Sequence, residues 1–410
     1  MRLWLIAALL CCTPVLAQGD LGAATPPPAD KPSEKPQDKD KQEEDRGPLT
    51  FSRDRVGWGI SARAGVGFDT NIFKEDRNED SGWFADGRAA AFFGVNIADI
   101  IALGVEGRAS GRLYFGQDDA EDANIFDLWL AAFLKHPVDK PGFGGGIRVE
   151  ALYDQQQNYE IVGPLTRQDD LRRGDFRARS WFGWMPAGVL YLEWGLSARL
   201  TDYSEEENPE AGDVLGVNSL GSKDSWEFGI DFSPELRFWQ FFTVGPYIMF
   251  QYEWFREQFD LHPDTFSANG DKLQLLRFEY GAKARLRFWG FHQSYAKIYA
   301  RRQDDSAQGF NRYWQYGLMV QTEFKFAIVR IGGGFDVWTR EFDERADPDV
   351  LGASRESVFE RYLGINVELG VNFVWTLEVG ARYDFQRRTS DLNNEGYLAH
   401  QVSLFVGFDW

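Results

Sequence analysis

The stretch FEYGAKARLRF, from Phe278 to Phe288, alternates strictly between two kinds of side chain. Its even positions are apolar or aromatic, namely Phe278, Tyr280, Ala282, Ala284, Leu286 and Phe288. Its odd positions are glycine or charged, namely Glu279, Gly281, Lys283, Arg285 and Arg287. A period of two residues places neighbouring side chains on opposite faces of a β-strand. The segment therefore predicts a strand with one apolar face and one charged face.

The same alternation returns in segment after segment from Arg55 onward. In 101–115 the apolar set Ile101, Leu103, Val105, Leu113 and Phe115 faces away from Glu106, Arg108, Arg112 and Tyr114. In 223–238, large apolar side chains again alternate with charged ones. Soluble β-sandwiches also alternate, but their strands are usually shorter than these segments. The pattern therefore favours a sheet whose strands are longer than those of a soluble sandwich and have one continuous apolar face.

The connections between these segments fall into two kinds. Short links at 97–99, 185–188, 288–291 and 325–327 alternate with long acidic ones such as KEDRNED, GQDDAED, SEEENPEAGD and EFDERADPD. Tight turns at one end and long loops at the other are typical of bacterial outer-membrane β-barrels. We therefore predict an all-β, antiparallel up-and-down barrel of about sixteen strands, with eighteen as the alternative. An even strand number places both termini in the periplasm.

The ends of the chain predict three parts. Residues 1–17 have a basic start, an apolar run and small or apolar residues at Val15-Leu16-Ala17, as in a secretory signal peptide cleaved after Ala17. Residues 18–54 are rich in Pro, Lys, Asp and Glu and predict a disordered periplasmic arm, and 55–410 form the barrel. Both cysteines, Cys11 and Cys12, lie in the leader, so neither disulfides nor cysteine metal sites are expected.

Aromatic residues mark the strand ends and the end of the chain. The last segment ends on Trp410, with alternate positions behind it apolar. This ending resembles the signal read by the barrel-assembly machinery, which is an expected partner together with outer-membrane lipid. An interfacial girdle is expected from Trp83, Phe84, Trp181, Trp184, Trp239, Trp289, Trp314 and Trp375.

The inward faces predict a lumen that carries both signs of charge, with most charges paired across strands. Bases exceed acids locally on one wall, where Glu279 is the single acid expected against them. This predicted basic lane consists of Arg277, Lys283, Arg285, Arg287, Lys297 and Arg301. Such a lane lowers the energy of anionic solutes.

Aromatic side chains are also predicted to point into the lumen, which at about sixteen strands should hold an aqueous channel. They are Tyr114, Trp129, Trp181, Tyr191, Tyr247, Tyr295, Tyr299, Tyr313 and Trp338. Two interpretations stay open. The rings stack on the apolar faces of sugars, or they pack against a loop folded into the pore, for which the segment from Gln155 to Leu171 is the candidate.

Catalytic and metal chemistry finds little support in the sequence. The 4 histidines have no metal-ligand spacing. His292 and Ser294 form an H-x-S pair that resembles the pair of barrel lipid deacylases, but their phase places both on the lipid side. No enzyme activity, catalytic residue, metal, cofactor or nucleic-acid partner is expected.

The stretch GVGFDTNIF, from Gly65 to Phe73, resembles the Gly-Tyr-Asp-Ser-Asn-Val opening of a broad group of outer-membrane β-barrel porins, with Phe68 in place of the usual Tyr. That group is similar in architecture to exopolysaccharide-export barrels. The resemblance implies a passive pore that exports a polysaccharide, with an acidic exopolysaccharide as one candidate and a periplasmic export component as a partner. A general diffusion porin for small solutes and a structural outer-membrane barrel are the alternatives.

Overall fold

The computed structural model describes residues 56–72, 81–97, 101–115, 125–136, 142–162, 165–205, 224–238, 241–261, 268–288, 291–305, 312–345, 356–374, 376–391 and 396–409. The predicted leader, the predicted arm at 18–54 and Trp410 lie outside these ranges. No helix within them is long and apolar enough to span a membrane.

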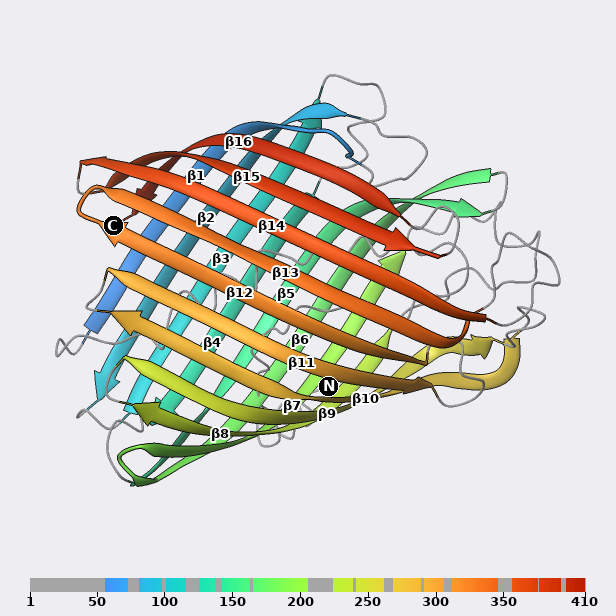
Figure 1. The fold of residues 1–410 in the computed structure, drawn as a ribbon, viewed down its shortest axis with the longest axis horizontal. Coiled ribbons are helices and arrows are strands. Elements are labelled where there is room, and N and C mark those ends of the chain that lie inside the picture. The colour runs from blue at the N-terminus through green and yellow to red at the C-terminus, as the bar shows by residue number, and fades with distance from the viewer. Residues whose placement is uncertain are drawn as a thin grey trace, which may run out of the picture.

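The described residues form one closed barrel of sixteen antiparallel strands, in which each strand pairs with its neighbours in the sequence and β1 pairs with β16 (Figure 1). The predicted all-β up-and-down barrel of sixteen strands is thus confirmed. The strands are β1 (Val56–Asp69), β2 (Gly82–Ile97), β3 (Ile101–Phe115), β4 (Ile125–His136), β5 (Gly142–Val162), β6 (Leu165–Ala187), β7 (Leu190–Glu205), β8 (Ser225–Phe238), β9 (Phe242–Leu261), β10 (Ala268–Phe288), β11 (His292–Asp305), β12 (Tyr313–Phe326), β13 (Val329–Arg345), β14 (Glu356–Val374), β15 (Leu377–Ser390) and β16 (Tyr397–Asp409).

The two ends of the barrel differ in the length of their connections. At one end, residues 188–189 join β6 to β7 and residues 327–328 join β12 to β13. At the other end, residues 206–224 separate β7 from β8 and residues 346–355 separate β13 from β14. We call these the turn end and the loop end. Strand β1 begins and β16 finishes at the turn end.

The segment from Gln155 to Leu171 is not a plug loop. It completes the β5–β6 hairpin, whose ladder runs from the pair Gly142↔Met185 without a register shift to Val162↔Leu165. The expectation of a loop there was wrong because the segment is polar and its apolar alternation is weak. Backbone pairing along the hairpin, which needs no apolar face, extends both strands at the loop end.

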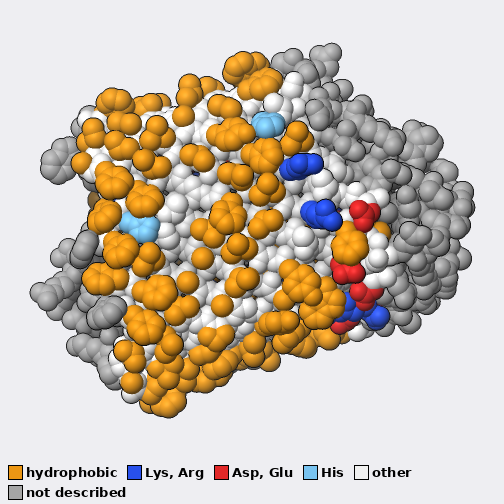
Figure 2. Space-filling view, in the orientation of Figure 1, with side chains coloured by type: hydrophobic (Ala, Val, Ile, Leu, Met, Phe, Trp, Pro, Cys, Tyr) orange, Lys and Arg blue, Asp and Glu red, His pale blue; other side chains and the backbone are white. Residues whose placement is uncertain are grey.

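The outer surface is apolar over most of its height. Large side chains such as Phe278, Leu404 and Val406 are exposed on it. Figure 2 shows hydrophobic side chains over the turn-end and middle parts of the face in view, with charged side chains gathered toward the loop end. An apolar outer belt around a closed barrel is the arrangement that lipid requires, because closure leaves no unpaired strand edge.

The aromatic girdle is present, but two predicted members, Phe84 and Trp181, point into the lumen instead. Trp83 and Trp184 are exposed on the outer face. Trp184 belongs to a row of rings with Phe143, at 5.9 Å between centroids. Phe84 instead points inward and is 1% exposed, against Tyr114, because it lies one residue out of phase with Trp83. The predicted members Trp239, Trp289 and Trp375 lie outside the described residues.

The motif Asp69-Thr70-Asn71 closes the seam between the first and last strands at the loop end. The backbone N–H of Thr70 donates to the carbonyl of His400 at 3.0 Å, and the hydroxyl of Thr70 accepts from the N–H of His400 at 2.9 Å. The amide of Asn71 donates to the carbonyl of Leu398 at 3.1 Å. Asp69 is fully buried and accepts a hydrogen bond from Gln401. The stretch that carries the family resemblance therefore has a structural role here.

Gly281 allows β10 to approach β11 closely. A Cβ added there would lie 2.0 Å from the carbonyl oxygen of Ile298, which is backbone and cannot move aside cheaply. We expect Gly281→Ala to reduce the free energy of unfolding by about 1–3 kcal/mol, as overpacking does. Gly87→Ala is the control, because a Cβ at Gly87 would meet nothing within 4 Å. The midpoint of heat-induced unfolding is read from the gel mobility of the folded barrel. Equal midpoints for Gly281→Ala and Gly87→Ala would contradict the prediction.

Candidate functional site

The inward faces of the strands build a polar lumen whose charges are paired across strands. Glu279 on β10 shows the arrangement, because it is 0% exposed and receives three donors. Lys297 Nζ lies 3.0 Å and Arg301 Nη2 lies 2.6 Å from its carboxylate oxygens, and the hydroxyl of Tyr247 donates to it at 2.6 Å. A buried carboxylate is tolerated only with such compensation.

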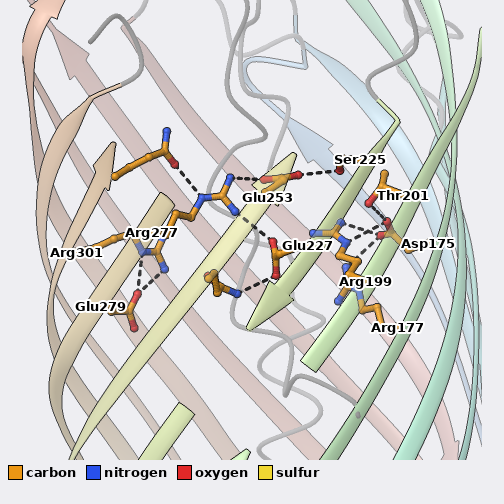
Figure 3. A network of polar contacts seen from close by, with 12 residues as sticks. Asp175, Arg177, Arg199, Thr201, Ser225, Glu227, Glu253, Arg277, Glu279 and Arg301 are labelled. Carbon is orange, nitrogen blue, oxygen red and sulfur yellow. Dashed lines mark hydrogen bonds and ion pairs between the residues drawn. The ribbon is translucent and has the colours of Figure 1, made fainter. Parts of the chain in front are cut away.

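The same pattern continues around the wall toward β8 and β6 (Figure 3). Arg277 lies 2.8 Å from Glu253 and 3.2 Å from Glu227, so one guanidinium joins three strands. Asp175 on β6 holds Arg199 at 2.9 Å and Arg177 at 3.1 Å. Period two sends every second residue of each strand inward, and the strand registers bring the charged positions of successive strands to one height.

On the other side of β11 the network passes through amides and aromatic rings. Gln315 on β12 accepts from Arg340 on β13 at 3.1 Å. Glu360 on β14 then lies 3.5 Å from Arg340 and 2.9 Å from Arg388 on β15. Together with the groups around Glu279, Arg277 and Asp175, these form a continuous band of buried polar side chains over β6 to β15. We call it the polar band.

Four members of the predicted basic lane form ion pairs with carboxylates of the lumen wall. Arg277, Lys297 and Arg301 are paired as described, and Lys283 lies 3.0 Å from Glu235. The expectation that Glu279 alone would face these bases was therefore wrong. The sequence missed Glu227, Glu235 and Glu253, which reach the lane from β8 and β9. Their inward phase was visible, but their height relative to β10 depends on the register.

Arg285 and Arg287, the other two members, differ from these four. They lie near the turn end of β10, on the same face and two residues apart. Among the described residues, neither has a carboxylate within ion-pair distance. Arg285 lies opposite Tyr295 in the β10–β11 register, with its guanidinium carbon 6.0 Å from the ring centroid, and Arg287 lies opposite Gln293. Both guanidinium groups are half-buried and face the lumen.

These two arginines line a cavity in the turn-end half of the lumen. Its charged lining consists of Arg63, Arg88, Arg285, Arg287, Arg330, Arg382, Glu323 and Glu368. Glu368 is held by Arg63 at 3.0 Å and by Arg330. Arg382 is paired with Asp384 at 2.6 Å. We call this cavity the arginine chamber. Six arginines and two glutamates line it, and Glu378 and Asp384 also pair with Arg330 and Arg382, so positive charge still exceeds negative charge and favours anions.

The nine predicted lumen aromatics divide by burial. Six are buried in the wall, namely Tyr114, Tyr191, Tyr247, Tyr299, Tyr313 and Trp338. Trp338, for example, stacks on Tyr362 at 5.4 Å between centroids. Trp129, Trp181 and Tyr295 are half-buried. Trp129 lies between Arg108 and Arg148, whose guanidinium carbons are 4.4 and 5.2 Å from its ring. Of the nine, these three present ring surface to the lumen.

The H-x-S pair lies on the outer face near the turn end, as its phase predicted. Ser294 Oγ is 2.8 Å from His292 Nε2 and 2.8 Å from the hydroxyl of Thr322. The ring of His292 lies 4.4 Å from that of Phe324. His292 Nδ1 is buried without a hydrogen-bond partner, so no acid in the described part orients the imidazole as a nucleophile's base requires. The described residues also contain no cluster of His, Cys, Asp and Glu that could hold a metal ion.

A closed antiparallel barrel with an apolar outer belt and a charged lumen defines the class of the protein, which is a transmembrane β-barrel of the bacterial outer-membrane type. No protein-family model matches the chain. No curated protein matches it either.

Solved outer-membrane structures resemble the barrel at low sequence identity. CdiB from Acinetobacter baumannii is 9% identical, with 87% of this chain and 60% of that chain covered and a TM-score of 0.45. A bacterial polysaccharide outer membrane secretin is 8% identical, with 86% and 98% covered and a TM-score of 0.39. OccAB4 from A. baumannii is 11% identical, with 89% and 100% covered and a TM-score of 0.40. The chain spans less than two thirds of CdiB from A. baumannii and from Escherichia coli, at 60% and 63%. These likenesses are too distant to carry an inference about function.

Proposed function

We propose that the protein is an outer-membrane pore through which an acidic polysaccharide leaves the cell. The observation that carries the proposal is the pair Arg285 and Arg287, which have no carboxylate partner among the described residues and face the arginine chamber. An unpaired guanidinium in a confined lumen lowers the energy of a passing anion. The barrel itself supports a pore in general, and the charge of this chamber supports the anionic solute.

The carbohydrate part of the proposal rests on the neighbours of these arginines. Tyr295 is half-buried and lies opposite Arg285. A ring beside a guanidinium can stack on the apolar face of a sugar while the guanidinium binds its carboxylate. Trp129 and Trp181 offer further ring surface to the lumen. A general diffusion porin for small anions would share the arginines but would not need these rings, and a purely structural barrel would need neither.

We infer the orientation from the connections at the two ends of the barrel. The turn end carries the short connections and the ends of β1 and β16, so we place it in the periplasm, as in bacterial single-chain barrels. The arm at 18–54 would then extend on the side where a periplasmic export component could contact it. The last strand would be the segment that the barrel-assembly machinery recognises. In this orientation, the arginine chamber is at the periplasmic entrance, where an outgoing polymer first enters the lumen.

Planar-bilayer recordings of the purified barrel test the proposal. In a salt gradient, the reversal potential is expected to show a preference for anions, because Arg285 and Arg287 add positive charge to the conducting path. Oligogalacturonate is expected to block the current at a lower concentration than uncharged maltodextrin of equal length. A preference for cations would contradict the anionic solute. Equal block by both oligosaccharides with anion preference would instead favour a diffusion porin.

A further inference from the structure

Two arginines lie on the lipid-facing side of the barrel, near the loop end. Arg361 on β14 lies opposite Thr389 on β15, and Arg387 on β15 lies opposite Leu363 on β14. The two arginines are therefore diagonal neighbours on adjacent strands, a separation of about 7–8 Å between Cα atoms. Both side chains are exposed. Like charges this close repel each other, and an anion bound between the two arginines would offset that repulsion.

Two other outward arginines at this end have carboxylate partners within the chain. Arg302 on β11 lies 2.7 Å from Asp343 and 3.0 Å from Asp304, and Arg312 lies 3.1 Å from Asp304. Arg361 and Arg387 have no such ion pair with a described residue. The carboxylate of Asp391, one row nearer the loop end, accepts the backbone N–H of Phe359 at 3.0 Å. The partner that Arg302 finds within the chain is thus lacking for Arg361 and Arg387 in the described part.

The surroundings of the pair are amphipathic. Leu363 and Leu398 lie opposite Arg387 on the neighbouring strands, and Ile365 and Phe385 form the next row of the outer face toward the turn end. His400, opposite Phe385, lies beside them and bonds the hydroxyl of Tyr383 at 2.9 Å. In Figure 2, charged side chains of both signs follow the hydrophobic surface toward the loop end. Arginine at such a boundary keeps its stem in the apolar layer and its head among polar headgroups.

We propose that Arg361 and Arg387 form a binding site for the phosphate of a phosphorylated membrane lipid. Two planar guanidinium groups can each bind phosphate oxygens through paired hydrogen bonds. The acyl chains of the same lipid would lie against the apolar rows below. The site is on the outside of the barrel, so it is independent of the solute that passes through the lumen.

Lipid retention by the purified barrel, measured by native mass spectrometry, tests this site. The probe is diphosphoryl lipid A, with its fully dephosphorylated form as the uncharged comparison. Arg361→Gln/Arg387→Gln is expected to weaken retention of the diphosphoryl form roughly thirtyfold, since each basic side chain near a membrane surface contributes a factor of about five. Retention of the dephosphorylated form should be equal in the variant and the parent protein.

Arg302→Gln/Arg312→Gln is the matched control, because it removes the same charge from the same face at positions already paired with carboxylates. It should retain the diphosphoryl lipid as the parent does. Equal losses in both double variants, or no loss in either, would overturn the proposal. Displacement of the diphosphoryl lipid by inorganic phosphate at the same concentration would also overturn the proposal, because it would show an anion site without a lipid component. For each variant, faster gel migration of the unheated sample than of the heated sample verifies that the protein is folded.

Discussion

Glu279→Ala is expected to reduce the free energy of unfolding by about 3–5 kcal/mol, the cost of leaving a buried ionic partner uncompensated. The carboxylate is fully buried and binds Lys297, Arg301 and Tyr247 at once. Its removal leaves two cations close together in the polar band without a shared anion. Urea-induced unfolding of the barrel in lipid vesicles, followed by tryptophan fluorescence, measures the loss.

Two further variants separate burial from charge in this result. Asp304→Ala also removes an ion-paired carboxylate, but its side chain is 40% exposed, so the expected loss is only about 0–1 kcal/mol. Replacing Glu279 with Leu and both Lys297 and Arg301 with Met removes the whole buried cluster and should recover most of the lost stability. Equal losses for Glu279→Ala and Asp304→Ala would show that water reaches the polar band.

The barrel could be predicted from the sequence because its decisive property is local. The period of two in Phe278–Phe288 fixes which side chains of β10 face lipid, whatever its neighbours are. The lengths of the connections fix which end of the barrel is which, and the strand count follows from repeating that step along the chain. Phe84 was misplaced because it was assigned by its aromatic type, although the phase of Asp86 and Arg88 already places it inward.

The pairing inside the lumen could not be predicted in the same way. Whether Lys283 meets Glu235, or Arg277 meets Glu227, depends on the relative height of β8 and β10, which are not neighbours in the sheet. That height results from the registers of β8–β9 and β9–β10, and an error of two residues in either would change every pair. The sequence therefore predicted which residues are basic and inward but not which of them remain unpaired.

The partners of the Asp69-Thr70-Asn71 motif could not be predicted from the sequence either. Asp69 and Asn71 are both fully buried, yet the contacts that bury them come from Leu398, Gln401 and Tyr114, which are distant in the sequence. A resemblance can mark such a motif as important without giving its partners. The same holds for the outer arginines, because the lack of a carboxylate partner in the described part became visible only when the strands were in register.

Arg285→Glu/Arg287→Glu is expected to reverse the ion preference of the pore. The change replaces two positive charges with two negative ones in the arginine chamber, next to the conducting path. Coulomb interaction with an ion several ångströms away, reduced by salt screening, gives a change on the order of tenfold in the anion-to-cation permeability ratio. Folding should be preserved, because neither arginine has an ion pair with a described residue and the lipid-facing Ala284, Leu286 and Phe288 are unchanged.

Arg302→Glu/Arg312→Glu makes the same change in net charge on the outer face and should leave the reversal potential unchanged. An inserted inner-face variant that keeps the parent's reversal potential would show that Arg285 and Arg287 lie off the conducting path, and the anionic-solute proposal would lose its main support. Secretion answers a separate question. If the ion preference reverses while secretion of an acidic polymer stays normal, the protein is a pore, but the proposal that it exports this polymer is contradicted. If both change in the inner-face variant alone, the arginine chamber acts on the polymer itself, since the outer-face variant has the same net charge.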